Sequence, residues 1–165
     1  MSNARVLTVN EVAALTARLA GRPCSPRQVR YLLISGGLGT DVQTRPRGGT
    51  RLYGVLDVAL VRLALAIESG GVSAWLTRVS LTYLRDDVVR AWKSAASLAF
   101  VLRGIQARLE PVAKGRPSRA VVWVPLREIW RGLDAEVQQV SNARNSVWMY
   151  RPVAVHAVPR ATTGE

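Results

Sequence analysis

The sequence predicts a mainly helical protein with a small amount of β structure. Apolar residues recur at helical spacing over much of residues 8–109, two glycine-flanked segments alternate as strands do, and glycine and proline divide the chain into blocks. The expected units are an N-terminal DNA-binding domain (1–84), a helical dimerisation segment (85–110), a small α+β module of strand, helix and strand (119–158) and a flexible tail (159–165).

Length and composition exclude several classes of protein. The chain has 165 residues, of which 48% are hydrophobic, so it can bury a real core and is not wholly disordered. No apolar run approaches the ~20 residues of a membrane span, and residues 1–5 lack the apolar region of a signal peptide. With Cys24 and His156 the only cysteine and histidine, neither an internal disulfide nor a zinc site is expected. We expect a cytoplasmic protein without metal or cofactor.

The charge balance is the strongest compositional signal. The chain has 23 Lys and Arg against 11 Asp and Glu, a net charge of +12. Only Lys93 and Lys114 are lysines, and guanidinium groups match phosphate oxygens well. An arginine-rich, high-GC genome would give the same preference, so the net charge is the better indication of a nucleic-acid partner.

The first two helices have clear start signals. Thr8 and Glu11 have the spacing of a capping box, in which each side chain bonds the other residue's backbone amide. Residues 21–23 interrupt that helix, and Ser25 and Pro26 begin a second, with serine as N-cap and proline at the first helical position. Two short helices with a short connection predict a helix-turn-helix.

A basic hairpin is expected directly after these helices. Residues 40–44 and 50–53 have the character of strands, and the glycine pair at 48–49 suits a turn with positive φ. A hairpin in this place is a wing, so the pattern predicts a winged helix-turn-helix. The arginines of the wing are Arg45, Arg47 and Arg51.

Further helices are expected at residues 57–67 and 74–84, the second capped by Ser73. Beyond them, apolar residues alternate in steps of four and three, which is typical of a coiled-coil seam and predicts a dimerisation helix. The alternative is that this stripe packs on residues 119–158 of the same chain. The seam consists of Val88, Trp92, Ala95, Ala99, Leu102, Gln106 and Leu109.

The last block predicts a strand at 120–124, a helix at 126–140, a turn at 142–146 and a strand at 147–158. A unit this small cannot hold a core alone, so we expect it to pack on the preceding block or on a partner. Its aromatic residues could line a ligand pocket, but at this spacing they are more often core. They are Trp123, Trp130 and Trp148.

Several pieces of residues 6–84 occur in an order that resembles the MerR family of winged-helix transcription regulators. Here the connection at 17–23 is longer than the family's, and Leu32 stands where a second tyrosine is usual. The resemblance implies a winged DNA-binding domain followed by a dimerising helix. The matching pieces are Thr8-Val9-Asn10-Glu11-Val12-Ala13, Ser25-Pro26-Arg27-Gln28-Val29-Arg30-Tyr31, Gly37-Leu38, Arg51-Leu52-Tyr53 with Asp57, and Gly71-Val72-Ser73.

The second helix carries the candidate base-reading residues. A recognition helix directs its first residues toward base edges in the major groove, and here these are Arg27 and Gln28. Arginine can bond guanine and glutamine can bond adenine, each through two atoms; the alternative is a solvated helix face. The resemblance implies that Arg30 and Tyr31 contact the phosphate backbone, and Tyr31 could also be a half-buried aromatic residue.

The wing supplies the remaining candidate contacts. Arg45, Arg47 and Arg51 could line phosphates or a minor-groove edge, although an ordinary charged hairpin would look the same. The resemblance implies that Tyr53 first packs the wing onto the domain and only secondarily contacts phosphate. Cys24, just before the second helix, could sense redox state, but a lone cysteine is more often a small packing residue.

The expected function is a sequence-specific, double-stranded DNA-binding transcription regulator that acts as a homodimer. We expect it to associate with the nucleoid and to come from a bacterium, a phage or a mobile element. The alternative is an excisionase-like or architectural protein that bends DNA with partner proteins. RNA polymerase or a recombination protein would be a further partner. An enzyme is not expected, because the sequence has no glycine-rich phosphate loop, no histidine pair and no nucleophile beside a base.

Overall fold

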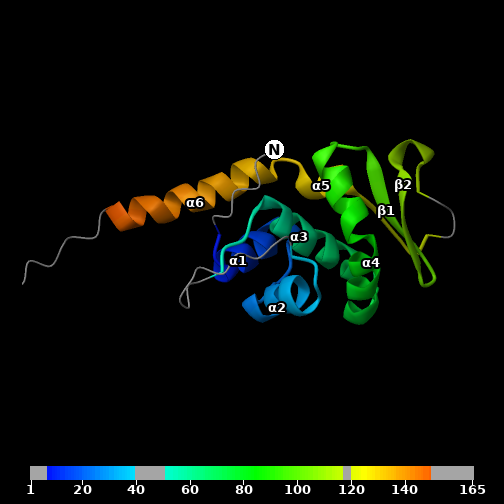
Figure 1. The fold of residues 1–165 in the computed structure, drawn as a ribbon, viewed down its shortest axis with the longest axis horizontal. Helices are drawn as coiled ribbons and strands as arrows, with labels where there is room; N and C mark the ends of the chain where they lie inside the picture. Colours follow the sequence, from blue (N-terminus) through cyan, green and yellow to red (C-terminus); the bar gives the residue numbers. More distant parts are fainter. Residues whose placement is uncertain (1–6, 40–50, 117–119, 150–165) are drawn as a thin grey trace, which may run out of the picture.

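The computed structural model describes residues 7–39, 51–116 and 120–149 (Figure 1). Helices surround one central helix, and a small sheet lies at one end of the molecule. The elements are α1 (Val9–Ala20), α2 (Pro26–Arg30), the π-helical turn η1 (Tyr31–Ser35), α3 (Val55–Ser69), α4 (Ala74–Lys93), β1 (Leu98–Arg103), β2 (Gln106–Pro111), the 3₁₀ turn η2 (Val112–Lys114), β3 (Val122–Pro125), α5 (Leu126–Trp130) and α6 (Leu133–Met149).

The helix starts expected from the sequence are confirmed. The Thr8 amide donates to Glu11 Oε2 at 2.6 Å, and the Glu11 amide donates to Thr8 Oγ1 at 3.3 Å, so the capping box of α1 is complete. The Ser25 hydroxyl accepts from the Gln28 amide at the start of α2, and Ser73 does the same for α4. These bonds satisfy amides that have no partner within the helix.

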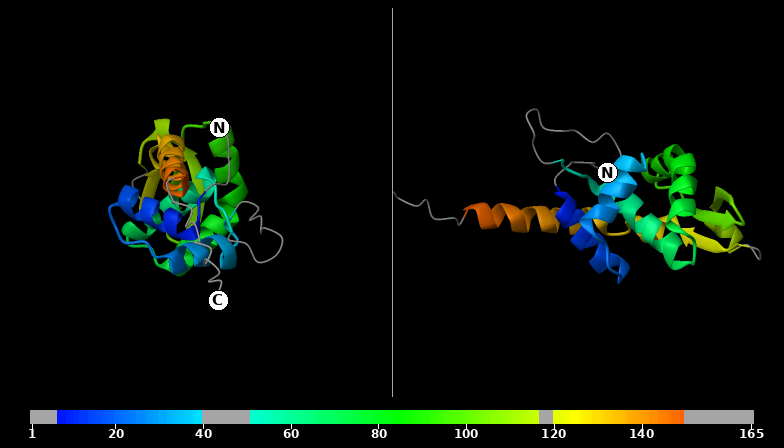
Figure 2. Two further views of the ribbon diagram at one scale, coloured as in Figure 1. Left: turned by 90° about the vertical axis from the view of Figure 1, so that its left-hand side faces the viewer. Right: turned by 90° about the horizontal axis from the view of Figure 1, so that it is seen from below.

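Helix α3 is the centre of the fold. Eleven of its 15 residues are buried, as expected of a helix that is apolar on every side. It begins two residues before the expected start, and the Asp57 carboxylate accepts from the Gly54 amide at 2.8 Å. Around it pack α1, α4, α5, α6 and β3 (Figures 1 and 2).

The sheet has three antiparallel strands in the order β2-β1-β3. The central strand β1 places Phe100 opposite Leu109 on one side and opposite Val124 on the other. Four consecutive residues of β1, from Ala99 to Leu102, are buried, so both faces of this strand are covered.

The helix expected over residues 85–110 is confirmed as far as Lys93 and is wrong beyond it. Helix α4 ends at Lys93, and the chain then forms the hairpin of β1 and β2, with Gly104 at φ 58° in its turn. The alternative, packing within the same chain, holds for most of the stripe. Leu109 is half-buried, and Ala95 is exposed in a turn with a φ of 51°. The four buried members are Val88, Trp92, Ala99 and Leu102.

The expected order of the last block is correct for its first half only. The strand and the following helical residues are present as β3, α5 and α6, with a break at Gly132, whose φ is 70°. The turn expected at 142–146 is wrong, because α6 continues through it to Met149 and excludes a strand at residues 147–149. Arg18 bonds Glu136 at 2.6 Å and Arg144 bonds Glu11 at 3.0 Å, so salt bridges hold α6 against α1. Residues 150–165 lie outside the described part.

One continuous hydrophobic cluster runs from Leu7 to Val137 and takes in residues of all three sequence blocks. Trp130 is buried within it, Trp123 is half-buried, and the side chain of Trp148 lies outside the described part. The C-terminal half of α6 projects past α1 (Figures 1 and 2). No helix in the described part of the chain is long and apolar enough to cross a membrane.

Candidate nucleic-acid interface

The connection between α1 and α2 fixes the direction of the candidate recognition helix. Gly21 closes α1 in the left-handed conformation at φ 63°, and its amide bonds the Ala17 carbonyl. Arg22 then reaches across to α3, where it donates to the Leu65 carbonyl at 3.1 Å and lies 3.5 Å from the Glu68 carboxylate. The start of α2 is therefore tied to the C-terminal end of α3.

Arg27 and Arg30 are the exposed cations of α2. They lie three residues apart and therefore share one helix face. Within the described part of the chain, neither forms an ion pair with an acidic residue, whereas Arg22 does. In the described part of the chain, they are thus exposed cations that no carboxylate neutralises.

Gln28 has a different environment from its neighbour Arg27. Its side chain is half-buried, and Nε2 donates to Glu68 Oε2 at 3.4 Å. Burial raises the pKa of Glu68, and the Arg22 guanidinium opposes that effect. The structure thus places the Gln28 side chain against the end of α3, where this long hydrogen bond competes with a contact to a base.

Tyr31 lies at the start of the π-helical turn with 43% of its surface exposed. The Arg78 guanidinium of α4 lies over its ring, with Cζ 5.7 Å from the ring centroid. Beneath this pair the chain passes closely at Gly36, where a Cβ would lie 2.5 Å from the Leu32 carbonyl oxygen and 3.3 Å from Arg78 Cδ. Only glycine fits there without a shift of the backbone.

Arg78 is a candidate residue that the sequence reasoning missed. Arg85 lies two turns further along α4 on the same face, and this repeat was the available signal. Arg85 donates to the carbonyls of Leu38 at 3.3 Å and Gly39 at 3.0 Å. Arg78 thus adds a cation beside α2, while Arg85 fixes the chain that leaves η1.

The described residues on either side of the segment 40–50 are held by the fold. At the first end, Arg85 bonds the Gly39 carbonyl; at the second, Leu7 and Tyr53 exchange two backbone hydrogen bonds of 3.1 and 2.8 Å. The expected first strand and turn of the wing, with Arg45 and Arg47, fall outside the described residues. Gly39 and Tyr53, which flank this segment, are therefore fixed to α4 and to the residue before α1.

Tyr53 is buried, with 1% of its surface exposed, so its role is packing. Burial raises the pKa of its hydroxyl, while the guanidinium groups of Arg51 and Arg30 act in the opposite direction. Both cations therefore lie near the same phenol. This joins Arg51, at the end of the basic segment, to Arg30 of α2.

The structure shows the surroundings of Cys24 and of the expected coiled-coil seam. Cys24 is half-buried, and burial raises the pKa of its thiol, which disfavours the reactive thiolate. The apolar residues of the expected seam, Val88, Trp92, Ala95, Ala99, Leu102 and Leu109, do not form a common helical face, because only Val88 and Trp92 lie on a helix.

The described cations of the candidate interface come from three parts of the chain. Arg27 and Arg30 come from α2, Arg51 from the end of the basic segment and Arg78 from α4. This arrangement can bind successive phosphates of a nucleic acid, with Arg27 nearest the N-terminus of its helix.

Comparisons of the chain with models of known protein families, with curated proteins and with solved structures gave no match.

Proposed function

We propose that this chain is a double-stranded DNA-binding transcription regulator whose helix α2 enters the major groove. The single observation that carries the proposal is the exposed pair Arg27 and Arg30, on a capped helix and without acidic partners in the described part of the chain. The net charge of +12 and the resemblance of residues 6–84 to the MerR family support the same function.

In this arrangement, Arg27 reads base edges while Arg30, Tyr31, Arg51 and Arg78 contact the backbone. The basic segment with Arg45 and Arg47 then lies along phosphates or in a minor groove. Tyr53 supports the segment from inside the core. Gln28 contributes less to the readout, because its bond to Glu68 competes with an adenine contact.

A second candidate is an architectural or excisionase-like protein that coats and bends DNA. It gains support from the absence of a coiled-coil helix over residues 85–110, since that helix was the sequence argument for a homodimer. A regulator dimer would need another contact surface. A location on the nucleoid, and RNA polymerase or a recombination protein as partner, belong to these two proposals.

Selection of bound sites from random DNA, followed by footprinting over a range of salt concentrations, tests both candidates. A regulator selects one sequence and protects one discrete site, whereas an architectural protein gives weak preference and spreading protection. The Arg127→Ala variant is the matched control, because this exposed arginine of α5 is remote from α2 (Figure 1). No difference between double-stranded DNA and a neutral polymer would exclude both.

A further inference from the structure

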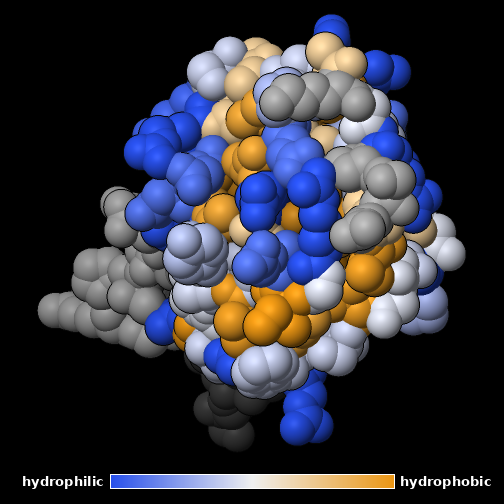
Figure 3. Space-filling view, turned by 90° about the vertical axis from the view of Figure 1, so that its right-hand side faces the viewer, coloured by the Kyte–Doolittle hydropathy of each residue, from blue (hydrophilic) through white to orange (hydrophobic). Residues whose placement is uncertain are grey.

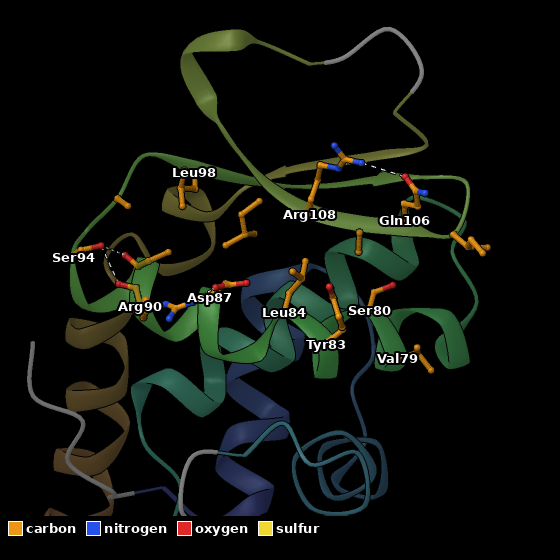
Figure 4. A pocket seen from close by; sticks show the side chains of 15 residues that line it. Val79, Ser80, Tyr83, Leu84, Asp87, Arg90, Ser94, Leu98, Gln106 and Arg108 are labelled. Atoms are coloured by element: carbon orange, nitrogen blue, oxygen red, sulfur yellow. Dashed lines mark hydrogen bonds and ion pairs between the residues drawn. The ribbon is translucent and has the colours of Figure 1, made fainter.

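An open groove of about 940 Å³ lies between helix α4 and the edge strand β2 (Figure 4). It runs along α4 from Val79 to Ser94, and the hairpin of β1 and β2 forms its other wall. All its lining residues belong to the described part of the chain. The residues that line it include Val79, Tyr83, Asp87, Arg90, Ile105 and Arg108.

Large apolar side chains are exposed at this groove. Tyr83 is 81% exposed, Ile105 at the hairpin turn is 83% exposed and Val79 is 41% exposed. Figure 3 faces the side of the molecule that carries α4 and the sheet, and it shows apolar surface bordered by hydrophilic residues. A gathering of this kind marks a contact surface more often than a single exposed apolar residue does.

Strand β2 lies at an edge of the sheet, and its residues also line the groove. In the order β2-β1-β3, strand β2 pairs only with β1, and no other group in the described residues bonds its backbone. An edge strand offers a row of amides and carbonyls that another extended chain can pair with. The position of an open edge beside a helix suits a peptide that adds one strand and lays its side chains on α4.

The charges around the groove leave one cation in excess. Asp87 pairs with Arg90, and Glu110 lies 3.1 Å from Arg103 and 4.0 Å from Arg108. Three arginines thus share two carboxylates, and the nearer bond of Arg108 is to the neutral Gln106 amide oxygen at 3.2 Å. This local excess and the net charge of +12 favour an acidic partner over a second copy of this chain.

We propose that the groove binds an extended acidic segment of a partner protein. The segment adds to β2 as a further strand, places apolar side chains over Tyr83 and Ile105, and directs a carboxylate to Arg108. This proposal is independent of DNA binding. At 100° per residue, Tyr83 and Asp87 lie 140° and 180° around α4 from Arg78, the residue of this helix that the proposed DNA interface uses.

A synthetic peptide of alternating valine and glutamate, dye-labelled and matched in length to β2, tests the proposal on the full chain. We expect saturable binding in fluorescence anisotropy, with NMR amide shifts on β2 and on the groove face of α4. A valine–lysine peptide should bind about tenfold or more weakly. The same acidic peptide with N-methylated backbone amides should lose a similar factor of about tenfold, because it cannot donate to the strand edge.

Variants of the groove identify the contacts. Tyr83→Ala, Ile105→Ser and Arg108→Glu should each weaken binding about fivefold or more. Tyr83 and Ile105 are mostly exposed, so their variants should fold, which circular dichroism checks. The matched controls are Val121→Ser, 51% exposed and outside the groove, and Arg127→Glu on α5; both should bind as the parent does.

Several outcomes of the peptide experiments overturn the proposal. They are no saturable binding of the acidic peptide, equal binding of the lysine peptide, shifts that lie outside the groove, and groove variants that bind as the parent does. A parent dimer that Ile105→Asp converts to a monomer in light scattering would also overturn it, because the occupant would then be a second copy.

Discussion

The indole rings of Trp92 and Trp130 meet edge to face, with centroids 5.4 Å apart and planes at 89°. Trp92 lies near the end of α4 and Trp130 ends α5, so this contact joins the middle of the chain to its last block. Both rings are buried in the common hydrophobic cluster. The contact therefore belongs to the folding of one chain.

Trp92→Ala should lower the free energy of unfolding by about 3–5 kcal/mol, because it removes a large buried ring and leaves a cavity. Trp92→Glu should unfold the protein, since a charge there has no partner. Urea denaturation followed by circular dichroism measures both. Trp75→Ala, at a tryptophan 63% exposed on the same helix, is the control and should change little. A folded Trp92→Glu monomer from a dimeric parent would return this residue to an interface.

Arg27→Ala should lose about 1–3 kcal/mol of discrimination at one base pair, because its side chain is exposed at the start of α2. Gln28→Ala should have a smaller effect on readout, since Gln28 is half-buried and bonded to Glu68. Site selection with each variant and the parent gives the comparison. Unchanged preferred sequences with Arg27→Ala would remove this residue from base readout.

Arg51→Ala should weaken binding by a similar factor on all DNA sequences and reduce the salt dependence by about one released counterion. The reason is that Arg51 follows directly after the segment 40–50 and acts on the same Tyr53 hydroxyl as Arg30 of α2 does. Binding isotherms at several salt concentrations measure the slope. Arg127→Ala should leave the slope as in the parent, and an equal slope for Arg51→Ala would place residue 51 away from DNA.

Glu68 should make stability fall with rising pH. Its pKa is raised in the folded protein, chiefly by burial, so the folded state holds the proton more tightly than the unfolded state. Stability from this group is fully present below the unfolded value of about 4.3 and is lost as pH rises through the folded pKa. Urea denaturation across that window should show a weaker decline for Glu68→Gln.

The matched control for this measurement is Asp86→Asn, because the Asp86 side chain is 83% exposed. Its pH dependence should follow the parent. A Glu68→Gln variant whose stability falls with pH as steeply as the parent's would mean that another group carries the effect.

Local signals allowed much of the helical part of the fold to be predicted. The starts of α1, α2 and α4 follow from Thr8, Ser25 and Ser73, since each cap is a hydrogen bond between residues three apart in sequence. Such a bond needs only the local chain. Arg27 and Arg30 could be placed on one exposed face for the same reason.

The candidate interface as a whole needed the fold. Arg78 lies over the Tyr31 ring, and Arg85 bonds the Gly39 carbonyl, although α4 is remote from α2 in sequence. Packing on α3 brings these residues together. The same packing turns Gln28 toward Glu68, which its position in the first helical turn does not reveal.

The sequence by itself determined the mainly helical class, the capped helix starts and the strongly basic charge. Only the tertiary structure decided the secondary structure of residues 94–111. Their apolar residues are spaced alternately by four and three, which fits a helix, yet the chain forms β1 and β2. An apolar run of this length satisfies both periodicities, so the choice depends on non-local pairing. Strand β1 gains its second neighbour from β3, and Phe100 and Leu102 complete the core that α3 and α5 leave open.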